Sequence, residues 1–228
     1  MKKIVVLTGS GISKESGIKT FRETGGLWEE HRIEEVATYE AWEQNTELVL
    51  EFYNQRRKQL LEVEPNAAHY ALVKLEKKYD VQIITQNVDD LHERAGSKNI
   101  LHLHGELLKS QSTMDEDMVY DIDGWELNLG DVCEKGSQLR PHIVWFGEAV
   151  PMITNASVIS QQADIFIVIG TSMAVYPAAG LIGYVPESKA KYIVDPNATN
   201  IGYVSNLEII KENAGKGVPE LVEKLLTK

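Results

Sequence analysis

Short apolar runs recur along the chain and alternate with segments of helical periodicity. Several runs are apolar at every position, which is typical of strands covered on both faces of a parallel sheet. The runs lie at 4–7, 81–84, 100–103, 165–169, 192–194 and 207–210. Strands that alternate with helices in this way predict an α/β fold with a doubly wound, Rossmann-like parallel sheet.

Two helices are predicted from apolar residues at helical spacing. One opens at Pro65-Asn66, and the C-terminal one has Pro219 near its start, where proline is well tolerated. The apolar positions are Ala68, Leu72 and Leu75 in the first helix, and Val218, Leu221, Val222, Leu225 and Leu226 in the second.

Two segments break the alternation. Residues 28–79 contain two or three successive helices without a strand, which is too much for one crossover. Residues 110–140 are acidic and weakly patterned, with one possible short strand at 118–122. We expect these two segments to form a smaller inserted domain. The larger, Rossmann-like domain then consists of residues 1–27, 80–109 and 141–228.

Composition excludes several classes of protein. The 228 residues are 43% hydrophobic and 25% charged, as in soluble globular proteins, so a disordered chain or a collagen-like fibre is excluded. No apolar run reaches the roughly 20 residues that span a bilayer. The apolar start runs into a glycine-rich turn, so we expect no signal peptide. No heptad pattern indicates an oligomer, and we expect a monomer.

Charge and cysteine content restrict the binding partners and the cellular compartment that we expect. The 34 acidic and 23 basic residues give a net charge of −11, which disfavours binding to nucleic acid or to an anionic membrane. Cys133 is the only cysteine, so an intramolecular disulfide and a cysteine-rich zinc site are both excluded. We therefore expect a cytoplasmic protein with neither nucleic acid nor membrane as a partner.

A glycine-rich turn follows the first strand, over Thr8-Gly9-Ser10-Gly11-Ile12-Ser13. Such a turn can place backbone N–H groups and a helix N-terminus against a phosphate. The G-x-G pattern lacks the third glycine of the ordinary dinucleotide fingerprint. A phosphate cradle and a plain strand-to-helix turn are therefore both open on this signal alone.

Two polar segments lie where a nucleotide would bind. Phe21 and Arg22 follow the glycine turn and would either cover a ligand or pack on the surface. The run 85–90 follows the second strand, and its Gln86, Asn87 and Asp89 could bind ribose hydroxyls. A helix cap rich in Asn and Asp is the better explanation of this run taken alone.

Histidines and small residues occupy other strand ends. His102 and His104 share a face at the end of the third strand, and His104 at its tip suits a general base. The same H-x-H spacing could be half of a metal site or simply structural. Gly170-Thr171-Ser172 and Asp195 end later strands, where a cofactor and its ribose could lie.

Taken together, these residues resemble the sirtuin family of NAD-dependent protein-lysine deacylases. The resemblance extends in family order from residue 4 to residue 226. It is carried by TGSGIS, SGIKTFR, GLW, TQNVDDLHERAG, LHG, RPHIVWFGE, IGTS, VYPAA and VPELV. It implies that the larger domain binds NAD as a co-substrate and that acylated lysine side chains of proteins are the partners.

The resemblance also implies a role for each matching residue. His104 would be the general base, with Asn87 beside it at the nicotinamide end. The cofactor would contact Gly9, Ser10, Gly11, Ser13, Phe21, Arg22, Gln86, Asn87, Asp89, Gly170, Thr171, Ser172, Asp195 and Ala214. Val144, Phe146, Gly147 and Glu148 would contact the acyl-lysine and pair with its peptide by strand addition. The products would be nicotinamide, free lysine and an O-acyl-ADP-ribose.

The sequence departs from the family at two places. Most sirtuins hold a structural zinc with four cysteines, whereas here Ser112 lies about where the first is expected and only Cys133 remains. With His142 as the sole nearby nitrogen ligand, we expect no zinc. Ser10 stands where the family usually has alanine, a change that we expect cofactor binding to tolerate.

Tyr53 and Arg56 bear on which acyl group is removed. They lie three residues apart on a predicted helix and therefore share a face. The sirtuins that prefer succinyl- and malonyl-lysine carry such a Tyr-x-x-Arg pair in the acyl pocket, and a guanidinium can bind a carboxylate with two hydrogen bonds. The resemblance thus implies a bacterial-type desuccinylase and demalonylase with deacetylase activity. Without it, a surface arginine paired with Glu51 or Glu62 would be the simpler explanation.

Two other functions remain open. Enzymes with related folds act as NAD-consuming ADP-ribosyltransferases or as NAD glycohydrolases, and these reactions need no acyl-lysine tunnel. A catalytically silent NAD-sensing module is the third possibility. The set Asn87, Asp89 and His104 disfavours a silent module, and the pair Tyr53 and Arg56 favours a deacylase.

Overall fold

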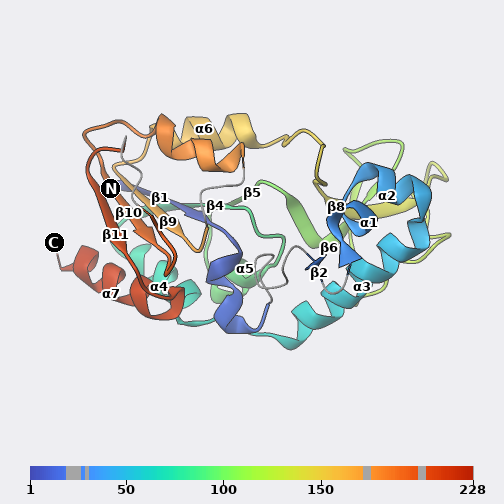
Figure 1. The fold of residues 1–228 in the computed structure, drawn as a ribbon, viewed down its shortest axis with the longest axis horizontal. Helices are drawn as coiled ribbons and strands as arrows, with labels where there is room; N and C mark the ends of the chain where they lie inside the picture. The colour runs from blue at the N-terminus through green and yellow to red at the C-terminus, as the bar shows by residue number, and fades with distance from the viewer. Residues whose placement is uncertain (19–26, 29–30, 172–175, 200–203, 228) are drawn as a thin grey trace.

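The computed structural model describes residues 1–18, 27–28, 31–171, 176–199 and 204–227. A parallel sheet of six strands forms the centre of its larger part (Figure 1). In spatial order the strands are β11 (Leu207–Ile210), β10 (Ala190–Val194), β9 (Ile165–Ile169), β1 (Lys3–Thr8), β4 (Asp80–Thr85) and β5 (Ile100–His102). These are the six predicted strands, and the predicted doubly wound fold is confirmed.

The strand order reverses direction at the centre of the sheet. From β1 the chain moves outward through β4 to β5, and later it returns to the other side of β1 as β9 and continues through β10 to β11. The loops that follow β1 and β9 therefore leave neighbouring strands and diverge. In parallel sheets this point forms a crevice at the carboxyl ends of the strands, where ligands bind.

Both faces of the sheet are covered, because alternate residues of each strand point to opposite sides. Ile4 and Val6 belong to the core that includes α4 (Ala67–Leu75) and α7 (Ala214–Leu226). Val5 and Leu7 belong to the core under α6 (Ile153–Gln161) and the 3₁₀ helix at Ala178–Tyr184. Figure 1 shows these two helical layers on either side of the strands. None of the described helices combines the length and the apolar character that crossing a bilayer requires.

The C-terminal helix begins earlier than the sequence predicted. It starts at Ala214, so Pro219 lies inside the helix rather than near its start. The predicted start was too late because glycine disfavours the interior of a helix, and Gly215 and Gly217 lie within this one. At position 217 a Cβ would lie 2.6 Å from Val194 Cγ1, so glycine permits the close packing of this helix on β10.

Helices and a small antiparallel sheet form the rest of the chain. The helices are α1 (Ile33–Val36), α2 (Tyr39–Gln44), α3 (Thr46–Glu62) and the short α5 (Leu91–Ala95). The sheet has the order β7 (Val119–Asp121), β6 (Gly105–Ser112), β8 (Leu139–Ile143), and β2 (Leu27–Trp28) pairs separately with β3 (His31–Arg32). The short strand expected within 118–122 is thus confirmed as β7.

The segments 28–79 and 110–140 pack against each other, as we expected because neither alternates strands with helices. Trp42 and Phe52 from the helices share a core with Leu107 of β6 and with Leu127. The buried guanidinium of Arg57 on α3 donates to the Trp125 carbonyl at 2.8 Å. Helix α4, however, packs in the core of the large sheet, although the predicted boundaries assign it to the smaller domain. The division into two domains stays a prediction.

Two buried histidines, from α4 and α5, pack against each other. His69 of α4 and His92 of α5 have ring centroids 5.0 Å apart, and neither side chain is exposed. His69 Nδ1 accepts the N–H of Asn66, and His92 Nε2 lies 3.0 Å from the hydroxyl of Thr8 at the end of β1. Burial lowers the pKa of His69 to about 4 and the pKa of His92 well below its usual value.

We expect this pair to make the protein sensitive to acid. Because the folded pKa of His69 lies below its unfolded value near 6.5, stability falls as the pH drops from 6.5 toward 4. His69 alone should lower the free energy of unfolding by about 2 kcal/mol between pH 7.5 and 5. Urea unfolding at both pH values measures this. H69Q, whose amide can replace the helix-capping contact, should show a correspondingly smaller loss, and an equal loss would contradict the assignment.

Candidate active site

One cavity collects the predicted site residues that the structure describes. It has a volume of about 480 Å³ and lies at the carboxyl ends of the central strands. The predicted residues that line it are Gly9, Ser10, Gly11, Ser13, Tyr53, Arg56, Gln86, Asn87, Asp89, His104, Val144, Phe146, Gly147, Glu148, Gly170, Thr171, Asp195 and Ala214. Phe21, Arg22 and Ser172 lie outside the described residues. The roles assigned to all of these residues stay predictions.

The glycines of the first turn are explained by backbone packing. Gly11 N–H donates to the Gly170 carbonyl at 2.8 Å, and Gly9 N–H donates to the Ile169 carbonyl at 3.0 Å. A Cβ at Gly11 would lie 2.6 Å from Gly170 Cα, and Gly170 itself has φ = 60°. Side chains are therefore excluded where the loops after β1 and β9 meet. The N–H groups of Ile12 and Ser13 also have partners within the turn, since they donate to the Gly9 and Ser10 carbonyls at 3.1 Å each.

Asn87, Ser13 and Asp89 form a buried hydrogen-bond network across the crevice. Asn87 Nδ2 donates to the Gly9 carbonyl at 3.3 Å and to Ser13 Oγ at 3.1 Å, while Ser13 Oγ donates to Asp89 Oδ2 at 2.9 Å. Burial raises the pKa of Asp89 to about 6, against the Ser13 hydrogen bond. The network ties the β4 loop to the β1 loop, so the run 85–90 does more than cap a helix.

His104 is held in one tautomer by the backbone. Its Nδ1 lies 3.0 Å from the carbonyl oxygen of Gln86, which can only accept a hydrogen bond. The neutral ring therefore carries its proton on Nδ1 and presents the lone pair of Nε2. Burial lowers the pKa of His104, against the Gln86 hydrogen bond, and keeps the ring neutral near pH 7. A neutral imidazole at the wall of a cavity is suited to general-base catalysis.

His102 has a different environment. Its Nδ1 lies 3.1 Å from the Asn87 carbonyl, and its Nε2 lies 2.8 Å from Glu93 Oε1. Burial opposes the charged form, but the hydrogen bond and charge of Glu93 raise the pKa of His102. His102 is not among the residues that line the cavity. It is therefore structural, and the two histidines do not form half of a metal site with each other.

Tyr53 and Arg56 reach the cavity from α3. Their exposed fractions are 1% and 9%, so the interpretation of Arg56 as a surface arginine is wrong. The Arg56 guanidinium lies 5.6 Å from the ring centroid of Phe52. Glu51, one of the two acidic partners considered, accepts a hydrogen bond from Gln55 instead. A phenol and a guanidinium on one wall of a cavity provide several donors for an anionic group.

Asp195 and Ala214 bring the last loops to the cavity. Asp195 follows β10, and its Oδ1 accepts the Asn197 N–H at 2.7 Å. Ala214 opens α7, whose next residue, Gly215, donates its N–H to Glu15 Oε2 at 2.6 Å. Glu15 thereby links the C-terminal helix to the segment after the glycine turn, although the two are 200 residues apart.

Sequence reasoning missed several lining residues. Among them are Glu15, Gln59, Trp145, Tyr176 and Asn213. Gln59 was detectable, because it lies three residues after Arg56 on the same helix face. Trp145 was not, because strict alternation assigns it to the face opposite Val144 and Phe146. Its contact with the cavity depends on tertiary packing.

The only cysteine lies in a small polar cluster between β6 and β8. Cys133 Sγ is 3.4 Å from both Ser112 Oγ and Ser137 Oγ, and the two hydroxyls are 2.8 Å apart. Hydrogen bonding with Ser112 and Ser137 lowers the pKa of the Cys133 thiol to about 7. Within the described ranges, no three His, Cys, Asp or Glu side chains gather to hold a metal. The absence of zinc stays a prediction.

Metal analysis tests this prediction directly. We expect the purified protein to hold far less than one equivalent of zinc, and a full equivalent would contradict the prediction. C133S should change the free energy of unfolding by less than about 1 kcal/mol, because a hydroxyl can make the same hydrogen bonds. S112A is the matched control, since it breaks the hydroxyl pair and should cost about 1 kcal/mol.

Comparison with known proteins points to one family. The model of the Sir2 family matches residues 9–177. A protein of Helicobacter pylori (strain ATCC 700392 / 26695) named NAD-dependent protein deacylase is 55% identical over 228 residues, covering 99% of this chain and 98% of its own. The crystal structure of a Sir2 homolog–NAD complex superposes with a TM-score of 0.89 at 38% identity, covering 99% of this chain and 90% of its own. A structure described as Sir2 bound to acetylated peptide gives 0.81 at 29% identity, with 99% and 94% covered.

Proposed function

The chain belongs to the Sir2 family, and from this premise we propose that it is an NAD-dependent protein-lysine deacylase. The observation that carries the proposal is the single cavity. His104 and Asn87 line this cavity together with the loops at the strand ends and with Tyr53 and Arg56. The relative from Helicobacter pylori bears this activity in its name, and Sir2 homologues have been solved with NAD and with an acetylated peptide.

The lining residues suit NAD as a co-substrate. The amides of Gln86 and Asn87, which follow β4, and the carboxylate of Asp195, which follows β10, can hydrogen-bond to amide and ribose groups. NAD supplies the ribose carbon to which the acyl oxygen bonds as nicotinamide leaves. The protein then has to hold both substrates in contact, which a closed crevice with fixed loops achieves by orientation.

The proton chemistry belongs to His104. With Nδ1–H donated to the Gln86 carbonyl, Nε2 is the atom that takes a proton from a ribose hydroxyl. The deprotonated hydroxyl attacks the acyl carbon, the bond from this carbon to the lysine nitrogen breaks, and the amine leaves with a proton. Water then adds to the acyl carbon, so that the products are free lysine and O-acyl-ADP-ribose. Because burial favours the neutral ring, His104 can accept a proton without first having to lose one.

Removing His104 tests this role. H104A should lower kcat/KM for deacylation at least about 100-fold, the usual size of a general-base contribution. In the unsubstituted protein kcat/KM should fall with acid only below pH 6.5, because the pKa of His104 is lowered and activity needs the neutral ring. H102Q is the matched control, since His102 does not line the cavity. If kcat/KM of H104A fell at low pH in the same way as in the unsubstituted protein, His104 would be excluded as the base.

We further propose that succinyl- and malonyl-lysine are preferred, with acetyl-lysine also accepted. Tyr53 and Arg56 support this preference, because both are buried in the cavity wall and both carry groups that can donate hydrogen bonds. An ionised acyl carboxylate can accept two bonds from the guanidinium and one from the phenol. An acetyl group ends in a methyl and gains none of these interactions.

Substitution of Arg56 tests the preference. R56M keeps the length of the stem but removes the charge, and it should lower kcat/KM for a succinylated peptide by about 10- to 100-fold more than for the acetylated one. K58M, which removes a positive charge from the exposed face of the same helix, is the matched control. Equal effects of R56M on both peptides would overturn the proposed preference.

An NAD glycohydrolase or ADP-ribosyltransferase is the alternative. Either would consume NAD in the same crevice, but neither needs the buried pair Tyr53 and Arg56. Nicotinamide released at the full rate without any acylated peptide would favour the hydrolase. Release that requires the peptide and matches deacylation one to one supports the deacylase.

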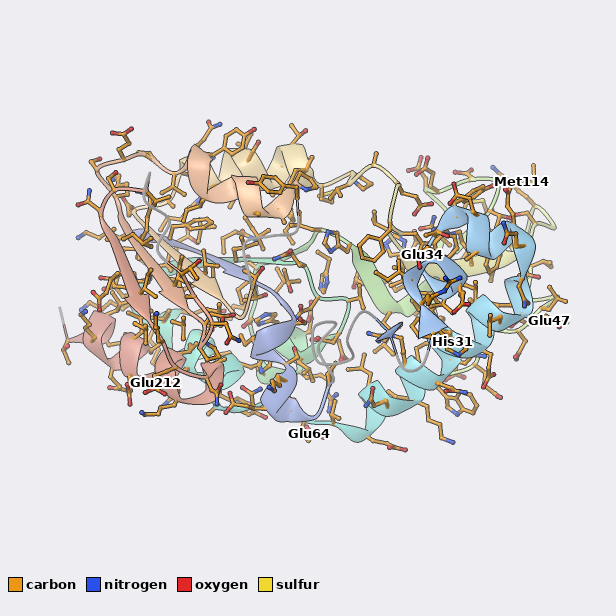
Figure 2. The ribbon with its side chains drawn as sticks, in the orientation of Figure 1. His31, Glu34, Glu47, Glu64, Met114 and Glu212 are labelled. Atoms are coloured by element: carbon orange, nitrogen blue, oxygen red, sulfur yellow. The ribbon has the colours of Figure 1, made fainter. Side chains whose placement is uncertain are left out.

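We also propose that the protein acts as a monomer in the cytoplasm, without nucleic acid or membrane partners. The charge distribution supports this, because exposed carboxylates such as Glu34, Glu47 and Glu64 and the partly exposed Glu212 come from both ends of the molecule (Figure 2). With a net charge of −11, such a surface repels polyanions.

A further inference from the structure

Trp145 contacts the phenol of Tyr53 at the acyl end of the cavity. Its indole Nε1–H donates to the Tyr53 oxygen at 3.0 Å. Both side chains are buried, with exposed fractions of 2% and 1%, and both residues line the cavity. A buried indole N–H needs an acceptor, and here the acceptor is a residue of the acyl pocket rather than a backbone carbonyl.

The indole ring packs against a cation and a second aromatic ring. The guanidinium carbon of Arg140 lies 3.5 Å from its centroid, and the ring of Trp42 packs at 5.7 Å. Arg140 binds both carboxylate oxygens of Glu148, at 2.8 and 3.0 Å, and Glu148 also accepts the backbone N–H of Trp145 at 2.7 Å. The position of the indole N–H is therefore fixed by a partly buried ion pair and an aromatic contact.

This contact decides how Tyr53 can hydrogen-bond. An indole N–H can only donate, so the phenol oxygen must accept from it. The single proton of the phenol is then left for another acceptor, and the phenol lies in the cavity wall. Burial raises the pKa of Tyr53 to about 12, so this proton is retained at physiological pH.

We propose that Trp145 is a positioning residue for acyl recognition, which orients the O–H of Tyr53 toward the carboxylate of a dicarboxylic acyl group. The inference rests on the proposed acyl preference and extends it to a residue outside the Tyr-x-x-Arg pair. An ionised carboxylate only accepts hydrogen bonds, so it matches a phenol that is committed to donating. A terminal methyl gains nothing from this orientation.

The test is the ratio of kcat/KM for succinylated and acetylated peptides at saturating NAD. W145F keeps an aromatic ring but removes the N–H, and it should lower this ratio about tenfold, mainly through KM for the succinylated peptide. W125F is the matched control, because it makes the same change at a tryptophan that does not line the cavity and whose ring lies against Lys58, and it should leave the ratio as in the unsubstituted protein.

Y53F and W145F together form a double-mutant cycle. Y53F should lower the ratio by about as much as W145F, and the double variant should be no worse than Y53F alone, because both changes remove the same interaction. The inference is overturned if W145F affects both peptides equally, if it leaves the ratio unchanged while Y53F lowers it, or if the two effects multiply. If R56M and Y53F both leave the ratio unchanged, the acyl preference itself has failed.

A measurement that does not depend on the folding of W145F uses ¹⁵N-labelled tryptophan. The chain has four tryptophans and therefore four indole N–H resonances. One of them should shift strongly in Y53F, and a succinylated peptide should shift the same resonance in the unsubstituted protein more than an acetylated peptide does. Equal shifts with both peptides would count against the proposal.

Discussion

The close approach of two backbone segments determines the geometry of the site. The loops that follow β1 and β9 meet where Gly11 and Gly170 leave no room for a side chain, and a hydrogen bond between them fixes their separation. This contact lies at the point where the strand order reverses, so it forms the floor of the crevice. Above this floor the polar residues at neighbouring strand ends converge on one cavity.

Backbone carbonyls then set the chemistry of the side chains above that floor. The Gln86 and Asn87 carbonyls each receive a ring nitrogen, from His104 and His102 respectively, so one short segment orients both histidines. The difference between them comes from their second nitrogens. His102 has Glu93 as a charged partner, whereas His104 lies in the cavity wall, where burial keeps it neutral. The same residue type therefore serves structure at one position and the proposed proton transfer two residues later.

The end of the cavity that we propose for the acyl group belongs to a different part of the fold. Tyr53 and Arg56 come from a helix of the first insertion, and Trp145 comes from the segment after β8. Their meeting depends on the core that joins the inserted helices to the small antiparallel sheet. In the small sheet, Ser112, Cys133 and Ser137 form a cluster that links β6 to the turn before β8 by hydrogen bonds.

The sequence by itself determined the six strands, their parallel arrangement and about half of the residues that line the cavity, because a strand covered on both faces is apolar throughout and its polar residues collect at its end. It placed the start of α7 too late, because the glycines that permit close packing on β10 look like helix breakers. Tertiary structure alone decided the tautomer of His104, the burial of Arg56 and the partner of Trp145. Each of these depends on a contact between segments far apart in the chain, and such contacts leave no local pattern of hydrophobic and polar residues.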